Sequence, residues 1–93
     1  MKVVNVAEAT VEIKNRLGMH LRAASTLAQT AARFKSQISI IKGKNKVNAR
    51  SVTGLIMLGA AIGTKLKVRA EGEDAKESLR AVQQLFEDRF GEE

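Results

Sequence analysis

A single histidine lies in the stretch LGMHLRAAS, residues 17–25, and it is the only histidine in the 93-residue chain. Gly18, two residues before His20, lets the chain turn tightly, and Arg22 lies two residues after His20. The small residues that follow are typical of a helix beginning near Leu21. A helix begins with unpaired backbone N–H groups and a partial positive charge, and together these bind anions. The stretch therefore predicts a titratable ring at the positive end of a helix, beside a fixed cation.

This arrangement suits a phosphoryl group carried on nitrogen. The helix dipole and Arg22 both disfavour the protonated ring, and a neutral imidazole nitrogen is a nucleophile. A phosphoryl group there would face the Arg22 guanidinium and the backbone amides of Leu21 and Arg22, with about 1.5–3 kcal/mol for each charge-assisted hydrogen bond. Because no base or second nucleophile accompanies His20, the pattern indicates a relay rather than an enzyme. A surface or helix-capping role for His20 is the alternative, which the residues alone leave open.

The composition limits the other sites and partners. The chain has no cysteine, and a single histidine argues against a structural zinc site, so we expect no disulfide, metal or cofactor. Sixteen Lys and Arg against ten Asp and Glu give a net charge of +6, which favours acidic partners. There is no Trp or Tyr, and the three Phe fall at helical spacing, so the stacking platform of a single-strand binder is missing. We therefore expect no nucleic-acid partner.

The length and the distribution of apolar residues predict one domain, residues 1–93, with one modest core. No apolar run is long enough to span a bilayer, so we expect no membrane insertion. The N-terminal stretch MKVVNVAEAT is too short and too polar for a secretory signal. We therefore expect a cytoplasmic protein, and a monomer because the predicted elements leave no extra apolar face.

Strand and helix patterns alternate along the chain. Period-two alternation predicts strands at residues 9–14, 36–42, 46–49 and 64–71, and helical spacing predicts helices at 21–34, 51–58 and 74–90. Asp74 and Glu77 form a capping-box pattern at the start of the last helix. Because each strand has one apolar face, we expect an α+β fold. The expected architecture is a two-layer open-faced sandwich of order β-α-β-β-α-β-α, with a four-stranded antiparallel sheet and three helices on one face.

Two blocks of the sequence resemble a known family. The stretch NRLGMHLRAAS closely resembles the active-site segment of the histidine-containing phosphocarrier proteins of the bacterial phosphotransferase system, which comprise HPr and its nitrogen-branch relative. The residues that match that pattern are Gly18, Met19, His20, Arg22 and Ala24. Residues 47–59, VNARSVTGLIMLG, resemble the regulatory segment of the family, and AEGEDA, residues 70–75, resembles its last strand-to-helix junction.

The resemblance implies a carrier function. His20 would accept a phosphoryl group on Nδ1 from phosphorylated enzyme I, which takes the group from phosphoenolpyruvate. It would then pass the group to a histidine on an enzyme II A domain, while Arg22 balances the charge. Enzyme I and the A domains would dock on the helix faces around His20 and Ser51. The docking residues that we expect are Met19, Val52, Leu55 and Ile56.

Two positions depart from the family pattern. Ala23 stands where the family usually has proline, and Leu21 stands where a smaller residue is common. Alanine also favours a helix, so we expect the first helical turn to form. The two departures bear on the rate of transfer and the choice of partner rather than on the chemistry of His20.

Ser51 precedes a short apolar helix, which its hydroxyl can cap. The resemblance implies that Ser51 is also a regulatory phosphorylation site for an HPr kinase/phosphorylase, and capping alone is the alternative. For Val52, Leu55 and Ile56, burial in the core is the alternative to docking. A regulatory interaction module of an incomplete phosphotransferase system, which controls other proteins according to its phosphorylation state, is the alternative to a carrier.

Overall fold

Strands and helices follow one another in the predicted order. The strands are β1 (Val6–Glu12), β2 (Gln37–Lys42), β3 (Asn45–Asn48) and β4 (Lys65–Glu71). The helices are α1 (Leu21–Ala32), α2 (Val52–Met57) and α3 (Ala75–Glu87), and the 3-10 turn η1 (Arg89–Gly91) follows α3. The computed structural model describes residues 5–92. Residues 1–4 and Glu93 therefore lie outside the described residues. Residues 1–4 belong to the N-terminal stretch in which we expect no secretory signal.

The four strands form one antiparallel sheet in the order β1-β4-β2-β3. Val68 of β4 pairs with Ala9 of β1 on one side and with Ile40 of β2 on the other, so β4 is a central strand. Alternate residues of the two central strands point to the same face, and this face is buried. The buried residues there are Ile38, Ile40, Leu66, Val68 and Ala70.

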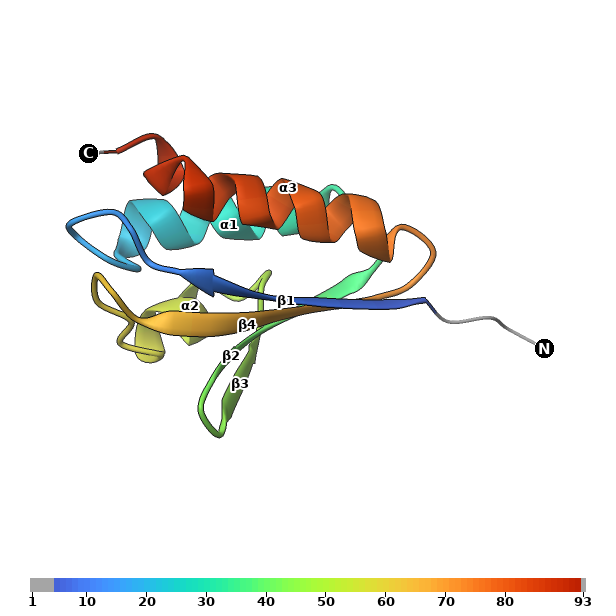
Figure 1. Ribbon diagram of the computed structural model, residues 1–93, viewed down its shortest axis with the longest axis horizontal. Helices are drawn as coiled ribbons and strands as arrows, with labels where there is room; N and C mark the ends of the chain where they lie inside the picture. Colours follow the sequence, from blue (N-terminus) through green and yellow to red (C-terminus); the bar gives the residue numbers. More distant parts are fainter. Residues whose placement is uncertain (1–4, 93) are drawn as a thin grey trace.

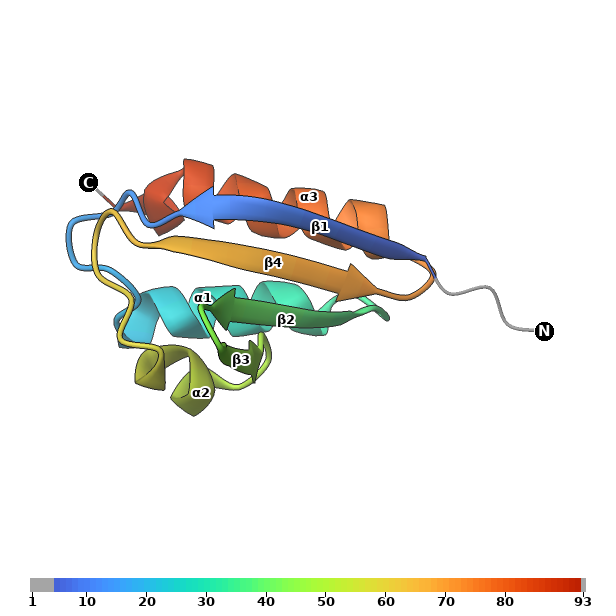
Figure 2. The same cartoon turned by 60° about the horizontal axis from the view of Figure 1, so that its bottom comes forward.

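Helices α1 and α3 lie side by side across one face of the sheet (Figure 1). Helix α2 lies beside α1 at the β3 edge (Figure 2). Helix α1 faces the core with small residues around Leu27, whereas α3 contributes the larger Val82 and Phe86. The predicted α+β open-faced sandwich is confirmed. Within residues 5–92, every helix falls short of the length and apolarity needed to cross a bilayer.

The ends of the predicted elements differ most at the two ends of the chain. Strand β1 begins at Val6 rather than Ala9, because its backbone pairs with β4 as far as Glu71. The last helix ends at Glu87, three residues before the predicted end, because Arg89 and Phe90 take positive φ angles of 55° and 54°. The other predicted ends lie within two residues of the observed ones.

The predicted capping box at Asp74 and Glu77 is wrong. Asp74 is the N-cap residue of α3, but its side chain makes no capping hydrogen bond within the described residues. Its carboxylate instead accepts hydrogen bonds from the Ser36 hydroxyl at 2.5 Å and from the backbone N–H groups of Lys35 and Ser36 at 2.9 and 2.8 Å. These bonds, chiefly the one from the Ser36 hydroxyl, hold the pKa of Asp74 below its ordinary value. The carboxylate thus joins the start of α3 to the loop before β2.

Candidate functional site

The loop between β1 and α1 carries His20 to the start of the helix. His20 is the N-cap residue of α1 and has an extended backbone. Gly18 has a φ of +69°, and a Cβ at this position would lie 2.5 Å from the carbonyl oxygen of Ala60, so only glycine fits. The N–H of Met19 donates to the same carbonyl at 2.9 Å. The tight turn expected at Gly18 is confirmed, and it fixes the loop against the segment that follows α2.

Asn15 holds this loop from the inside. Its side chain is fully buried, and Nδ2 donates to the carbonyl of Gly18 at 2.7 Å and to Oε1 of Glu92 at 3.1 Å. A buried amide is unfavourable unless it is hydrogen-bonded, so these contacts constrain the path of the chain. No pattern in the sequence singled out Asn15 as a site residue. Its only signal was an asparagine shortly before a glycine, which is typical of a turn.

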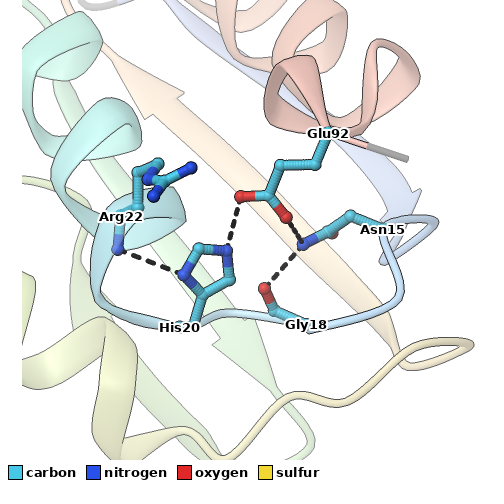
Figure 3. A network of polar contacts seen from close by, with 5 residues as sticks. All are labelled: Asn15, Gly18, His20, Arg22 and Glu92. Carbon is cyan, nitrogen blue, oxygen red and sulfur yellow. Dashed lines mark hydrogen bonds and ion pairs between the residues drawn. The ribbon is translucent and has the colours of Figure 1, made fainter.

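Both ring nitrogens of His20 have polar partners, as Figure 3 shows. Nδ1 accepts a hydrogen bond from the backbone N–H of Arg22 at 3.2 Å. Nε2 lies 2.5 Å from Oε2 of Glu92. An ionised carboxylate can only accept, so these contacts assign the proton to Nε2 and leave the lone pair on Nδ1. The neutral ring in this tautomer satisfies both contacts and presents Nδ1 as its nucleophilic nitrogen.

The pocket beside His20 carries more positive than negative charge and is open to solvent. The side chain is 27% exposed at the wall of a surface pocket. Arg16 and Arg22 also line this pocket, and neither guanidinium forms an ion pair within residues 5–92. The backbone N–H groups at the start of α1 add the positive end of the helix dipole. An anionic group beside Nδ1 would therefore meet an electropositive environment. Among the described residues, no three acidic, His or Cys side chains gather to hold a metal ion.

Ser51 is the N-cap residue of α2, as predicted. Its Oγ accepts a hydrogen bond from the N–H of Gly54 at 3.0 Å, and the residue is exposed. The capping role is confirmed, whereas regulatory phosphorylation of Ser51 stays a prediction. Because α2 packs against α1, the site at Ser51 and the site at His20 lie on neighbouring helices.

Two of the expected docking residues are core residues. Met19 and Leu55 are buried, Leu55 completely, so the prediction that they contact partners is wrong: buried side chains present no surface to a partner. Val52 is half-buried against the core, and Ile56 is exposed. Two helical turns are too few for the periodicity of α2 to separate its inner from its outer face.

Four other large apolar side chains between residues 17 and 62 are exposed. Leu17 and Leu21 border the pocket that contains His20. Met57, which is 80% exposed, lies on α2, and Ile62 lies in the segment that follows α2. Leu17 and Leu21, exposed at the same pocket, are apolar exposure of the kind that marks interaction surfaces. The signal in the sequence was weak, because leucine and methionine at helical spacing are more often buried.

Comparisons with known proteins agree with this fold and site. A family profile described as "PTS HPr component phosphorylation site" matches residues 7–88. The chain is 42% identical over 83 residues to phosphocarrier protein HPr of Neisseria meningitidis, covering 89% of this chain and 93% of that protein. It is 40% identical over 85 residues to phosphocarrier protein NPr of Shewanella violacea, covering 91% of this chain and 93% of that protein.

The similarity extends to the three-dimensional structure. The crystal structure of HPr-C-His from Thermoanaerobacter tengcongensis matches with a TM-score of 0.90 and 46% sequence identity, covering 94% of this chain and 98% of that one. The region matched by the family profile includes the loop of His20, the helix capped by Ser51 and all four strands except the first residue of β1. The chain therefore belongs to the HPr family of the phosphotransferase system, whose members are phosphocarrier proteins rather than enzymes.

Proposed function

We propose that Nδ1 of His20 accepts a phosphoryl group from phosphorylated enzyme I and passes it to an enzyme II A domain. The observation that carries this proposal is the tautomer of the ring, in which Nε2 faces a carboxylate and Nδ1 keeps its lone pair at the start of α1. The lone pair attacks phosphorus and forms the N–P bond, while the bond from phosphorus to the donor breaks and its electron pair returns to the donor. The second transfer reverses this step on the next acceptor.

The start of α1 stabilises the phosphoryl group on Nδ1. The backbone amides of Leu21 and Arg22 and the Arg22 guanidinium supply donors, and each charge-assisted hydrogen bond contributes about 1.5–3 kcal/mol. The N–H of Arg22 already points at Nδ1, at 3.2 Å. Transfer between partners needs a group that is held firmly but reversibly, and these contacts provide that balance without a metal or a second nucleophile.

We place the docking surface for both partners on the exposed apolar residues around the site. Leu17 and Leu21 flank His20, and Ile56 and Met57 lie on the adjoining helix. This assignment replaces Met19 and Leu55, which the core buries. The proposal takes the protein as cytoplasmic, because the phosphoryl group comes from phosphoenolpyruvate, a cytoplasmic metabolite, and it keeps the expectation of a monomer.

Phosphorylation of His20 can be tested directly. The protein is mixed with phosphoenolpyruvate, magnesium and a purified enzyme I, and its intact mass is recorded. We expect one added phosphoryl group that is lost in mild acid. The group should be absent in His20→Ala and present in Ser51→Ala. Labelling that persists in His20→Ala, or no labelling by the cognate enzyme I, would refute the proposed role of His20.

Ser51 supports a second, regulatory function. Its hydroxyl is exposed at the start of α2, where an HPr kinase/phosphorylase can reach it. A phosphate there would place about two negative charges beside the docking surface and repel acidic or phosphorylated partners. Incubation with such a kinase and ATP should add one acid-stable phosphate to the native protein and none to Ser51→Ala. Phosphorylation of Ser51 without any transfer through His20 would favour the regulatory interaction module over the carrier.

A further inference from the structure

We propose that Glu92 is a positioning residue for His20: its carboxylate orients the ring and balances the positive charge that the ring acquires during transfer. The inference rests on the proposed function of His20. Glu92 lies outside residues 7–88, the part of the chain that matches the family profile. Its partner His20 is 72 residues away in the sequence. No periodicity or motif in the sequence pointed to this contact.

A tight turn after α3 directs Glu92 toward His20. Figures 1 and 2 both show the C-terminal end of α3 beside the loop that joins β1 to α1. Arg89, Phe90 and Gly91 have consecutive positive φ angles of 55°, 54° and 76°. Non-glycine residues hold such angles only where their surroundings enforce them, and such residues cluster at functional sites. Here Phe90 is buried edge to face against Phe86, with ring centroids 5.0 Å apart, and this packing anchors the turn.

The carboxylate of Glu92 has a separate partner for each oxygen. Oε1 accepts from Nδ2 of Asn15 at 3.1 Å, and Oε2 lies 2.5 Å from Nε2 of His20 (Figure 3). The Glu92 side chain is only 15% exposed. The buried amide of Asn15 also donates to the carbonyl of Gly18 in the loop that carries the ring. One amide therefore holds both the carboxylate and the histidine loop, which distinguishes this contact from a loose surface ion pair.

This geometry has a consequence for transfer. When the lone pair of Nδ1 forms the bond to phosphorus, the ring becomes positively charged and keeps its proton on Nε2. The carboxylate of Glu92 accepts from that N–H and stabilises the charge, as carboxylates do for the imidazole of catalytic triads and of metal sites. When the phosphoryl group leaves, the electron pair returns to Nδ1 and the ring is neutral again. No proton needs to move to Glu92 in either direction.

The charges around the ring are divided between its two nitrogens. Glu92 is on the Nε2 side, whereas the first N–H groups of α1 are on the Nδ1 side. Arg16 and Arg22 line the same pocket and are the other charged groups that border it within the described residues. The carboxylate thus contacts the nitrogen that the phosphoryl group does not occupy, and the cations offset its repulsion of that group.

The test compares Glu92→Ala and Glu92→Gln with the native protein and with Glu87→Gln. Glu87 is a matched control, because its carboxylate lies at the same end of α3 but pairs with Lys14 at 2.8 Å and has no contact with His20 among the described residues. The first readout is the NMR signals of the His20 ring nitrogens and of the Nε2 proton in the unphosphorylated protein. The second is the rate of phosphoryl transfer from phosphorylated enzyme I.

In the native protein and in Glu87→Gln we expect a protonated Nε2 whose proton is shifted downfield by the carboxylate. Glu92→Ala should lose that shift. It should also transfer the group about 10- to 100-fold more slowly, the range found when the hydrogen-bond partner of a metal-binding histidine is removed. Glu92→Gln keeps a hydrogen-bond acceptor but not the negative charge, so its transfer rate should lie between those of the native protein and Glu92→Ala.

Three outcomes would overturn the proposal. Native ring signals and a native rate in Glu92→Ala would show that the contact does not act on His20. Slower transfer with unchanged ring signals would show that Glu92 acts elsewhere, for example in docking. If the native protein is not labelled on His20 at all, the proposed function fails and this inference falls with it. The labelling of the native protein therefore separates the failure of this inference from the failure of the proposed function.

Discussion

Replacing Gly18 by alanine tests how the loop positions His20. An alanine at φ +69° is in the left-handed region, which costs about 1–2 kcal/mol. The added Cβ would also lie 2.5 Å from the carbonyl oxygen of Ala60 and 3.1 Å from Cα of Ala61. Overpacking of this kind costs a further 1–3 kcal/mol or so, part of it through the weakened bond from the N–H of Met19 to Ala60. The expected loss of unfolding free energy is therefore about 2–5 kcal/mol.

Gly59→Ala provides a matched control. Gly59 has a φ of +62°, and a Cβ there would meet nothing within 4 Å. An alanine at this position has the same cost of about 1–2 kcal/mol for its left-handed backbone but makes no close contact like the one with Ala60. The difference between the two variants isolates the close approach of the loop to Ala60.

Urea unfolding and thermal melts of the native protein and both variants give the comparison. For a domain of this size, each 1 kcal/mol shifts the midpoint of thermal unfolding by about 4–8 °C, so Gly18→Ala should melt at least about 4 °C below Gly59→Ala. Because the clash moves the loop that carries His20, Gly18→Ala should also slow phosphoryl transfer. Equal losses of stability in the two variants would refute the argument from the close approach to Ala60.

Three further predictions concern residues whose structural roles are separate from Gly18. Leu55→Ala should lower the unfolding free energy by about 2–5 kcal/mol and Met57→Ala by no more than about 0.5 kcal/mol in urea titrations, because Leu55 is core and Met57 surface. Since hydrogen bonds, chiefly from the Ser36 hydroxyl, lower the folded-state pKa of Asp74, its stabilisation is complete above its unfolded-state pKa and disappears as the pH falls through the folded value. The difference in urea midpoint between the native protein and Asp74→Asn should therefore shrink on acidification, and parallel pH curves would contradict this. Ser51→Ala should lower stability by about 0.5–2 kcal/mol while Ser51→Asp, which can also cap, should not; equal thermal melts of these two variants would count against the capping role.

Much of the fold follows from local patterns. Alternation of apolar residues predicted the strands, and helical spacing predicted the helices, because these periods depend on neighbours a few residues apart. The same local logic placed His20 and Ser51 at helix N-termini, where the structure finds them as N-cap residues. The element order and the α+β class followed from the succession of these patterns.

The errors share one physical origin. Asp74 has the sequence pattern of a capping box, yet its carboxylate accepts hydrogen bonds from Ser36, 38 residues away. The packing of the chain brings the Ser36 hydroxyl and N–H within hydrogen-bond distance of this carboxylate. Met19 directly precedes His20 and Leu55 lies four residues after Ser51, but both side chains are buried in the core. A short segment does not specify which of its faces the rest of the chain covers.

The sequence by itself determined the order of the elements, the glycine turn at Gly18 and the histidine at the start of a helix with Arg22 beside it. Only the tertiary structure decided which distant residues surround His20. Asn15 and Glu92 are 77 residues apart and meet beside His20 because α3 and the turn that follows it return the chain to the loop before α1. Contacts within one turn of helix depend on residues a few positions apart, whereas a contact between distant segments depends on how the whole core packs.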